Sequence, residues 1–281
     1  MTTDCGRLFV VGTPIGNLSD LTLRAEEVLK EVRVVVCEDT RRTRKLLSQL
    51  GAKARLISCF EQKEELCAKD VVNMLLEGVD CAYCSDAGTP NISDPGRRLI
   101  EAVYKANIPI IPVPGVSAVT AILSCSPFKG DRFFFAGFLP EKQGPRQEFL
   151  RGIKEVECPI VFFEAPHRVK RALRDVMEII GDRSIVMGRE LTKIHEELVF
   201  DRVSGLIKRF EQIEPRGEFT FCMEGAKAGA KSEDSETIQE IEALLDLIKH
   251  GKYGTRELAT LISRISGIKK STIYNLAVKK G

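Results

Sequence analysis

Two of the three histidines in this chain lie in short charged stretches, and each stretch follows an apolar run. The first stretch is residues 164–168, EAPHR, and the second is residues 189–197, RELTKIHEE. Imidazole, carboxylate and amine groups transfer protons, and the cations among them contact phosphate. We therefore expect proton transfer or phosphate contact where these two strand-like runs end. A structural ion pair between Glu190 and Arg168 is the alternative.

Three polar, glycine-containing loops follow other strand-like runs. They are residues 12–17 (GTPIGN), 85–96 (SDAGTPNISDPG) and 113–119 (VPGVSAV). In open α/β sheets, ligands bind outside the carboxyl ends of the strands, where such loops lead into helices. None of the three loops matches a dinucleotide-binding or P-loop motif, and no serine lies in a GxSxG motif. The loops therefore indicate a ligand site without identifying the ligand.

The loop at 85–96 is longer than a turn between a strand and a helix requires. Asp94 followed by Pro95 is typical of a helix start, so we expect Asp94 to cap a helix there. Gly88 allows a close backbone approach to a ligand. A rigid polar loop suits a ligand the size of a nucleoside, and an elaborate turn without a ligand is the alternative. In the third loop, we expect Ser117 to cap a helix and to offer hydrogen bonds.

The composition is that of an ordinary globular protein, with 43% hydrophobic and 29% charged residues. No apolar run is long enough to cross a membrane, and the N-terminus lacks the basic region of a secretory signal. Nine scattered cysteines, an odd number, favour reduced thiols in the cytoplasm over a disulfide framework. Cys81 and Cys84 have the spacing of half a zinc site. No second pair accompanies them, however, and on a strand they point to opposite faces, so we expect no metal.

Positive charge is concentrated in two places, although the formal net charge is only +2. Residues 41–45, RRTRK, form one cluster, and residues 252–281 carry seven Lys or Arg against one Glu. Each cluster is compatible with a solvated surface. Together they favour an anionic partner such as nucleic acid.

The arrangement of apolar runs predicts the fold. In roughly the first 130 residues, the strand-like runs RLFVVG, RVVVC, RLISC, VDCAYC and PIIPV alternate with helix-like runs. They are continuous apolar runs, as in parallel strands buried on both faces, and they predict an α/β domain with right-handed crossovers. From Asp131 onward, five more strand candidates and three helices predict a second, α+β domain with a mixed sheet.

The last part of the chain has the composition of a linker followed by helices. Two short helical runs, TRELATLISRI and KKSTIYNLAVKK, suit a helix-turn-helix-like unit, with a plain helical hairpin as the alternative. We predict an N-terminal α/β domain, a second α+β domain, a linker and a basic helical extension. Their bounds are 1–128, 129–226, 227–236 and 237–281.

Six segments in this order resemble the tetrapyrrole (corrin/porphyrin) methylase superfamily: TPIGNLSDLTLRA, CEDTRRTRKLL, SDAGTPNISDPG, VPGVSAV, FFEAPHR and RELTKIHEE. The resemblance runs from about Leu8 to Gly225. Within the superfamily it is closest to the bacterial enzymes that methylate a ribose 2′-hydroxyl of 16S rRNA. Departures are small: Val116 stands where proline is usual, and Asn91 where an apolar residue is common.

The resemblance implies a two-domain methyltransferase, usually a homodimer, that binds S-adenosylmethionine (AdoMet) in the cleft between its domains. The three loops would form the floor of the cofactor site, and the segments RELTK and GEF would close it from the second domain. The cofactor-binding residues carried over from the family's motifs are Pro14, Gly16, Asp86, Ala87, Gly88, Thr89, Ser93, Asp94, Ser117, Ala118 and Leu191.

The implied reaction is transfer of a methyl group from AdoMet to the 2′-hydroxyl of a cytidine in the 16S rRNA of the 30S subunit. Alignment of the reacting atoms should supply much of the acceleration, because the donor is already activated. A base must still receive the hydroxyl proton, and the family does not fix it. By residue chemistry the candidates are His167, Glu190, Lys193 and His195.

An RNA substrate must be held largely through its phosphates, and with few aromatic residues we expect electrostatic docking that salt weakens. The candidate contacts are Arg41, Arg42, Arg44, Lys45, Arg168, Lys269 and Lys270. One alternative is a small-molecule tetrapyrrole methylase, which would not need the basic helical appendage. Another is a non-catalytic RNA-binding assembly factor, which would not keep intact cofactor loops.

Overall fold

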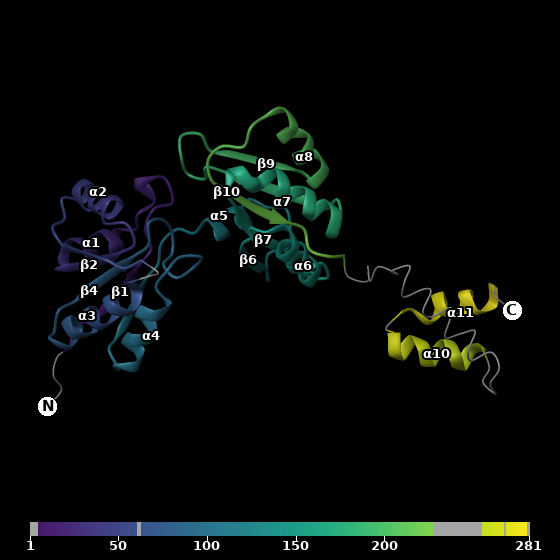
Figure 1. Cartoon of the computed structure of the whole chain (residues 1–281), viewed down its shortest axis with the longest axis horizontal. Helices are drawn as coiled ribbons and strands as arrows, with labels where there is room; N and C mark the ends of the chain where they lie inside the picture. Colours follow the sequence, from purple (N-terminus) through teal and green to yellow (C-terminus); the bar gives the residue numbers. More distant parts are fainter. Residues whose placement is uncertain (1–4, 61–62, 228–254, 267, 280–281) are drawn as a thin grey trace. The chain divides into compact units, whose positions relative to one another are not determined.

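A computed structural model describes residues 5–60, 63–227, 255–266 and 268–279 (Figure 1). The chain divides into two compact units, Met1–Gly225 and Ala226–Gly281. The first unit contains two five-stranded sheets. Among the helices of the described ranges, none is long and apolar enough to span a bilayer.

The first sheet is parallel, in the strand order β3-β2-β4-β1-β5, which confirms the predicted α/β arrangement. Its strands are β1 (Leu8–Val11), β2 (Val34–Cys37), β3 (Arg55–Ser58), β4 (Cys81–Cys84) and β5 (Ile110–Val113). The helices between them are η1 (Leu18–Asp20), α1 (Leu23–Glu31), α2 (Thr40–Leu50), α3 (Glu64–Leu76) and α4 (Arg97–Lys105).

Helices cover both faces of this sheet, so its central strands are apolar throughout. Cys81 and Tyr83 of β4 pack with α3 and α4, whereas Ala82 and Cys84 pack with α1 and α2. The two cysteines therefore point to opposite faces, as expected for residues three apart on a strand. Burial raises the pKa of the Cys81 thiol to about 11. Within the described ranges, no three His, Cys, Asp or Glu side chains are grouped to hold a metal.

The second sheet is mixed, as predicted, with the order β6-β7-β10-β8-β9 and one parallel pair, β6 with β7. Its strands are β6 (Phe134–Phe138), β7 (Ile160–Glu164), β8 (Ser184–Arg189), β9 (Glu197–Arg202) and β10 (Phe219–Met223). One face packs against α6 (Gln143–Ile153), α7 (Pro166–Ile179) and α8 (Val203–Gln212), and the other against α5 (Ala118–Ser124).

Helix α5 begins where the third polar loop ends. Ser117 occupies its N-cap position, as predicted, in an extended conformation, but its side chain makes no capping hydrogen bond. The helix buries Val119 and Ile122 against the second sheet, although it follows the last strand of the first sheet. This connection brings Ser117 and Ala118 between the two sheets.

The prediction that Asp94 caps a helix is wrong. Helix α4 begins at Arg97, and its N-cap is Gly96, whose φ of 128° favours glycine. The capping acceptor comes from α3: Glu64 Oε1 accepts hydrogen bonds from the backbone N–H groups of Gly96 (3.1 Å), Arg98 (2.7 Å) and Leu99 (3.4 Å). Because Glu64 satisfies these donors, the side chain of Asp94 is free to face elsewhere.

In the second unit, helices α10 (Thr255–Ser266) and α11 (Lys270–Lys279) bury Ala259, Ile262, Ile273 and Ala277 between them. This pairing agrees with the two short helices predicted at the end of the chain. Most of the predicted linker at 227–236, and the first part of the predicted extension, residues 237–254, lie outside the described residues.

We predict that Glu64→Ala lowers the free energy of unfolding by about 3 kcal/mol, because buried donors at the start of α4 lose their acceptor. Glu64→Gln, which keeps an oxygen acceptor, should lose about half as much. The measurement is the urea midpoint followed by far-ultraviolet circular dichroism. Glu65→Ala is the control: Glu65 is exposed and lies 3.6 Å from Arg98, so its loss should cost no more than about 0.5 kcal/mol. Equal midpoints for Glu64→Ala and Glu65→Ala would contradict the capping role.

Candidate functional site

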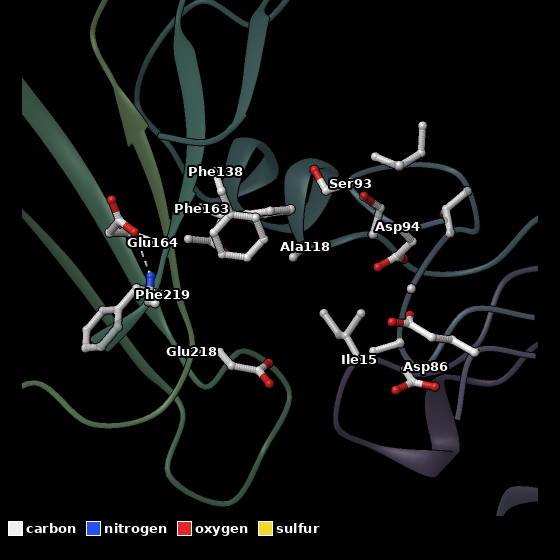
Figure 2. A pocket seen from close by; sticks show the side chains of 18 of the residues that line it. Ile15, Asp86, Ser93, Asp94, Ala118, Phe138, Phe163, Glu164, Glu218 and Phe219 are labelled. Carbon is white, nitrogen blue, oxygen red and sulfur yellow. Dashed lines mark hydrogen bonds between the residues drawn. The ribbon is translucent and has the colours of Figure 1, made fainter. Parts of the chain in front are cut away.

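A cavity of about 430 Å³ lies where the carboxyl-end loops of the first sheet meet the second sheet (Figure 2). The part of the chain that contains the first sheet, together with the start of α5, contributes Ile15, Glu38, Arg42, Asp86, Ala87, Gly88, Thr89, Ile92, Ser93, Asp94, Ser117 and Ala118. The part that contains the second sheet contributes Phe138, Phe163, Glu164, Ala165, Pro166, Glu218, Phe219 and Thr220. A volume of this size is typical of a pocket for a small organic ligand.

Hydrogen bonds tie the loop at 85–96 to its neighbours. Thr13 and Gly88 exchange two backbone hydrogen bonds, of 2.9 and 3.0 Å, which join this loop to the one after β1. The carboxylate of Asp86 accepts from the backbone N–H of Asp39 after β2, at 3.1 Å. The hydroxyl of Thr89 donates to the Val116 carbonyl after β5, at 3.4 Å. Four adjacent strand ends are thus linked, and the length of the loop serves this cross-linking.

Two residues of this loop adopt a left-handed backbone that non-glycine residues rarely take. The φ angles are 66° for Asn91 and 62° for Ser93. Such conformations cost energy and persist where the surrounding structure enforces them, often at functional sites. Here they bring Ile92, Ser93 and Asp94 to the cavity wall.

The second sheet supplies an aromatic and acidic wall. The rings of Phe138 and Phe163 pack edge to face with centroids 5.5 Å apart, and Phe138 remains 53% exposed. Glu164 is buried, and its Oε1 lies 2.9 Å from Arg168 Nε. Arg168 also donates to the carbonyl of Leu139. In Figure 2, Phe138 and Phe163 lie across the cavity from Ile15, Asp86 and Asp94.

The cavity is strongly acidic, with five carboxylates and one guanidinium on its wall. Burial, reinforced by the charges of Glu38 and Asp86, raises the pKa of Asp94 to about 6. Burial likewise raises the pKa of Glu38 and of Glu164 above their usual range. Arg42 lies 3.5 Å from Asp86, and Arg168 and Lys193 pair with Glu164 and Glu218. Of the five wall carboxylates, Glu38 and Asp94 therefore carry the charge that no cation of the described residues pairs with. The wall therefore favours a ligand that combines positive charge with a flat apolar group.

Most residues predicted to bind the cofactor line this cavity. They are Asp86, Ala87, Gly88, Thr89, Ser93, Asp94, Ser117 and Ala118. Pro14, Gly16 and Leu191 are not among its lining residues. A Cβ on Gly16 would lie 2.9 Å from Thr192 Oγ1 and 3.1 Å from the carbonyl oxygen of Leu191. Gly16 thus allows close contact between the first loop and the RELTK segment, whether or not it touches a ligand.

None of the four candidate bases lines the cavity. Lys193 lies 2.9 Å from Glu190 and 3.0 Å from Glu218, and Glu190 accepts a hydrogen bond from the backbone of Glu218 at 2.9 Å. The network holds the cavity residue Glu218 in place. Since Glu190 pairs with Lys193, and Arg168 with Glu164, the suggested ion pair between Glu190 and Arg168 is wrong.

The charges in this network oppose proton acceptance. Burial favours a neutral Glu190, but hydrogen bonds from Lys193 and Glu218 outweigh it and lower the pKa of the carboxyl. Burial likewise opposes the charge of Lys193, yet the two carboxylates raise the pKa of its ammonium group. A protonated Lys193 cannot accept a proton, and a stabilised Glu190 carboxylate is a weak base.

Of the two candidate histidines, only His167 is next in sequence to a residue that lines the cavity. His167 is exposed and directly follows Pro166, which lines the cavity, but His167 itself lines a separate, basic groove. His195 is exposed and lines another depression, with Arg189, Glu197 and Arg209.

The candidate RNA contacts occupy several surfaces. Arg41 pairs with Asp39 at 2.8 Å, and Arg42 lies at the cavity near Asp86. Arg44 and Lys45 are exposed on α2, and Lys269 and Lys270 are exposed in the second unit. Arg168 is largely occupied by Glu164 and Leu139. RNA binding by these residues stays a prediction.

Several cavity residues lie in segments that the sequence marked, although they were not named as ligand contacts. They are Ile15 and Ile92 in two of the loops, Glu164, Ala165 and Pro166 in the stretch 164–168, and Glu218 and Phe219 in the GEF segment. Glu38, Phe138, Phe163 and Thr220 were not named as contacts either. Glu38 directly follows β2, and Glu164 ends β7. Their position at strand ends was the available signal. The apolar members resemble ordinary core residues in sequence and carried none.

Residues 7–207 match the family model of Tetrapyrrole (Corrin/Porphyrin) Methylases. The ribosomal RNA small subunit methyltransferase I of Thermotoga maritima is 44% identical over 78% of this chain and 99% of its own length. The protein of the same name from Escherichia coli O157:H7 is 35% identical over 98% of this chain and 96% of its own length.

Solved structures share the fold. Uroporphyrin-III C-methyltransferase from Thermus thermophilus, complexed with S-adenosylhomocysteine, has a TM-score of 0.58 at 21% identity and covers 78% of this chain and 97% of its own. A cobalt precorrin-4 methyltransferase has a TM-score of 0.61 at 17% identity, with coverage of 78% and 94%. These likenesses confirm the predicted two-domain fold of tetrapyrrole methylases.

The raised pKa of Asp94 predicts a pH-dependent stability. Its unfolded carboxyl loses a proton near pH 4 and its folded carboxyl near pH 6, so the folded protein loses stability as pH rises between these values. Asp94→Asn removes this loss. Its stability relative to wild type should rise by on the order of 1–2 kcal/mol between about pH 4 and pH 7, measured by urea denaturation at each pH.

Asp131→Asn is the control for Asp94→Asn. Asp131 is fully exposed, and its pKa is lowered by Lys129, so this variant should show no relative gain over the same interval. If the difference in unfolding free energy between Asp94→Asn and wild type stayed constant or fell over this interval, the raised pKa of Asp94 would be contradicted.

Proposed function

Because this chain belongs to the tetrapyrrole (corrin/porphyrin) methylase family, and within it to the ribosomal RNA small subunit methyltransferase I proteins, we propose that its cavity binds AdoMet and that a 16S rRNA ribose receives the methyl group. The protein is a methyltransferase of small-subunit ribosomal RNA. The position methylated in our proposal is the 2′-hydroxyl of a cytidine.

The cavity fits AdoMet by its charge and by its apolar surfaces. AdoMet carries its methyl group on a positively charged sulfur, which makes the methyl carbon electrophilic toward an attacking oxygen. Asp94 and Glu38 give the wall a negative charge that complements this cation. The side chains of Ile15, Ala118 and Phe163 offer apolar surface for a flat base. This pairing of acidic and apolar walls is the observation that carries the proposal.

The relatives make the two alternatives less favoured. A small-molecule tetrapyrrole methylase shares the fold, but the relatives matched over nearly the whole chain are named as ribosomal RNA methyltransferases. A non-catalytic assembly factor would not need the cross-linked loops that form the cavity. We further propose the 30S subunit as the substrate particle, a homodimer as the working form and the cytoplasm as the location.

The function is tested by incubating the protein with methyl-labelled AdoMet and 30S subunits from cells that lack the corresponding modification. We expect label in 16S rRNA, and nuclease digestion should place it on a single ribose. Label on a base, or transfer to a tetrapyrrole such as uroporphyrinogen but not to RNA, would contradict the proposal.

Ala118→Phe connects this activity to the cavity. The added ring fills space beside the loop at 85–96, so AdoMet binding measured by calorimetry should weaken at least about 100-fold, and transfer should fall with it. Thr120→Phe adds the same ring at an exposed position of the same helix and should bind AdoMet normally.

For the proton acceptor we propose His167. Of the four candidates, Glu190 and Lys193 are held in a charged pair, and His195 lines a different depression. His167 is one residue from the cavity wall and lines the groove next to it. In this proposal the imidazole next to the cavity wall accepts the hydroxyl proton.

His167→Gln should lower kcat by about 100-fold or more while leaving the Kd for AdoMet unchanged, because a general base acts on the chemical step. Single-turnover methyl transfer at saturating AdoMet and 30S subunits is the measurement. His195→Gln serves as the matched variant and should retain nearly full activity. Equal rates for the two variants would exclude His167 as the base.

A further inference from the structure

A second cavity of about 530 Å³ lies on the first unit, between the start of α6 and the first turns of α7. We call it the α6–α7 groove. Its lining residues are Glu141, Lys142, Gln143, Arg146, His167, Arg168, Arg171, Arg174 and Asp175. Five of these nine side chains are Lys or Arg, and two are acidic.

The floor of the groove is a rigid, internally neutral ion pair. Arg146 and Asp175 are both buried and lie 2.6 Å apart. Arg146 also donates to the carbonyl of Glu141 at 2.8 Å. Gln143 and Gln147 donate to the other oxygen of Asp175, at 3.3 and 3.2 Å. The carboxylate of Asp175 is therefore occupied and leaves the cations at the surface uncompensated.

Three cations border this floor without a partner. Lys142, Arg171 and Arg174 are exposed, and within the part of the chain that the structure describes, no carboxylate lies within 4 Å of them. His167 joins Arg171 and Arg174 at helical spacing on α7, so these side chains follow one face of the helix. The stripe from His167 to Arg174 is about 10 Å long, from the rise of an α-helix.

The α6–α7 groove adjoins the cavity in which we propose that AdoMet binds. One chain segment runs from Phe138 in the cavity to Lys142 in the groove, and another runs from Glu164 to Arg168. The ion pair between Glu164 and Arg168, and the hydrogen bond from Arg168 to Leu139, join these two segments. A chain of negative charges lying in the groove would thus pass directly beside the cavity.

We propose that the α6–α7 groove binds the phosphates of the substrate RNA next to the nucleotide that is methylated. The inference rests on the proposed function, and it assigns the RNA path to residues that were not among the predicted contacts. Lys142, Arg171 and Arg174 contact phosphate oxygens, and the neutral floor keeps the groove open. Phosphates are the partner that unpaired guanidinium groups in a row bind best.

An extended polyanion fits the groove better than a small anion does. The three free cations are spread between α7, which carries Arg171 and Arg174, and the N-cap of α6, Lys142, rather than converging on one point, so a single phosphate contacts only some of them. A strand that follows all three also places its adjacent nucleotide at the cavity, where the exposed ring of Phe138 can support a base that has left its stack.

The test uses the full-length double variant Arg171→Gln/Arg174→Gln. Its control is Arg151→Gln/Lys208→Gln, which removes the same charge from exposed sites on α6 and α8, outside the groove. The first readout is binding of a fluorescein-labelled single-stranded oligoribonucleotide of 16S rRNA sequence at several salt concentrations. The second is the KM for 30S subunits in methyl transfer, and the third is the Kd for AdoMet by calorimetry.

We expect the groove variant to bind RNA about 10- to 100-fold more weakly, with a salt slope smaller by about 1 to 2, because two phosphate contacts are lost. Its KM should rise by a similar factor, while the Kd for AdoMet and the kcat stay near wild type. The control variant should match wild type in all three readouts. Inorganic phosphate should compete only weakly with the RNA.

Equal RNA affinity and salt slope in the groove and control variants would overturn the proposal, even if the wild-type protein methylates RNA. Tight binding of inorganic phosphate alone would overturn it in favour of a small-anion site. A third outcome separates the two proposals. If the wild-type protein bound RNA but transferred no methyl group to it, and only the groove variant lost RNA binding, the proposed function would fail and the RNA path would stand.

Discussion

The carboxylate of Glu64 accepts three backbone hydrogen bonds at the start of α4, and this contact decides where the preceding loop ends. Had Asp94 capped the helix, its side chain would point along the helix axis. Instead Asp94 faces the cavity. The two residues with left-handed backbone, Asn91 and Ser93, lie between the hydrogen-bonded start of the loop at Gly88 and the start of α4 at Gly96. Buried polar groups must be satisfied, so one acceptor from α3 determines the shape of the loop on the other side of the helix start.

The second constraint is the closure of the strand ends by the other sheet. Helix α5 leaves β5 of the first sheet and buries its apolar side chains on the second, which brings both halves to the cavity. Closure removes the carboxyl groups of Asp94, Glu38 and Glu164 from water, and this burial raises their pKa values. An acidic cavity and an adjacent basic groove then differ in the ligands they favour: a cation in the first and a polyanion in the second.

The sequence predicted the two sheets and most of the loops that line the cavity, because these features depend on local patterns. Continuous apolar runs identified the parallel strands, and the rule for carboxyl ends located the loops at Gly88 and Ala118. It did not predict the helix start after Asp94, because the competing acceptor, Glu64, is distant in sequence. It also did not reveal the pairing of Glu190 with Lys193 instead of Arg168, since charged residues at strand ends have several partners within reach. Phe138 and Phe163 carried no signal, because an aromatic residue in a strand is most often core.

We propose that the cavity between the two sheets holds AdoMet. The most direct measurement is a crystal structure of the full chain grown with saturating AdoMet. The account predicts density for the ligand between the loop at 85–96 and Phe163, with Asp94 and Ala118 in contact with it. Density for AdoMet at another place on the chain, with this cavity empty in the same crystal, would contradict the account.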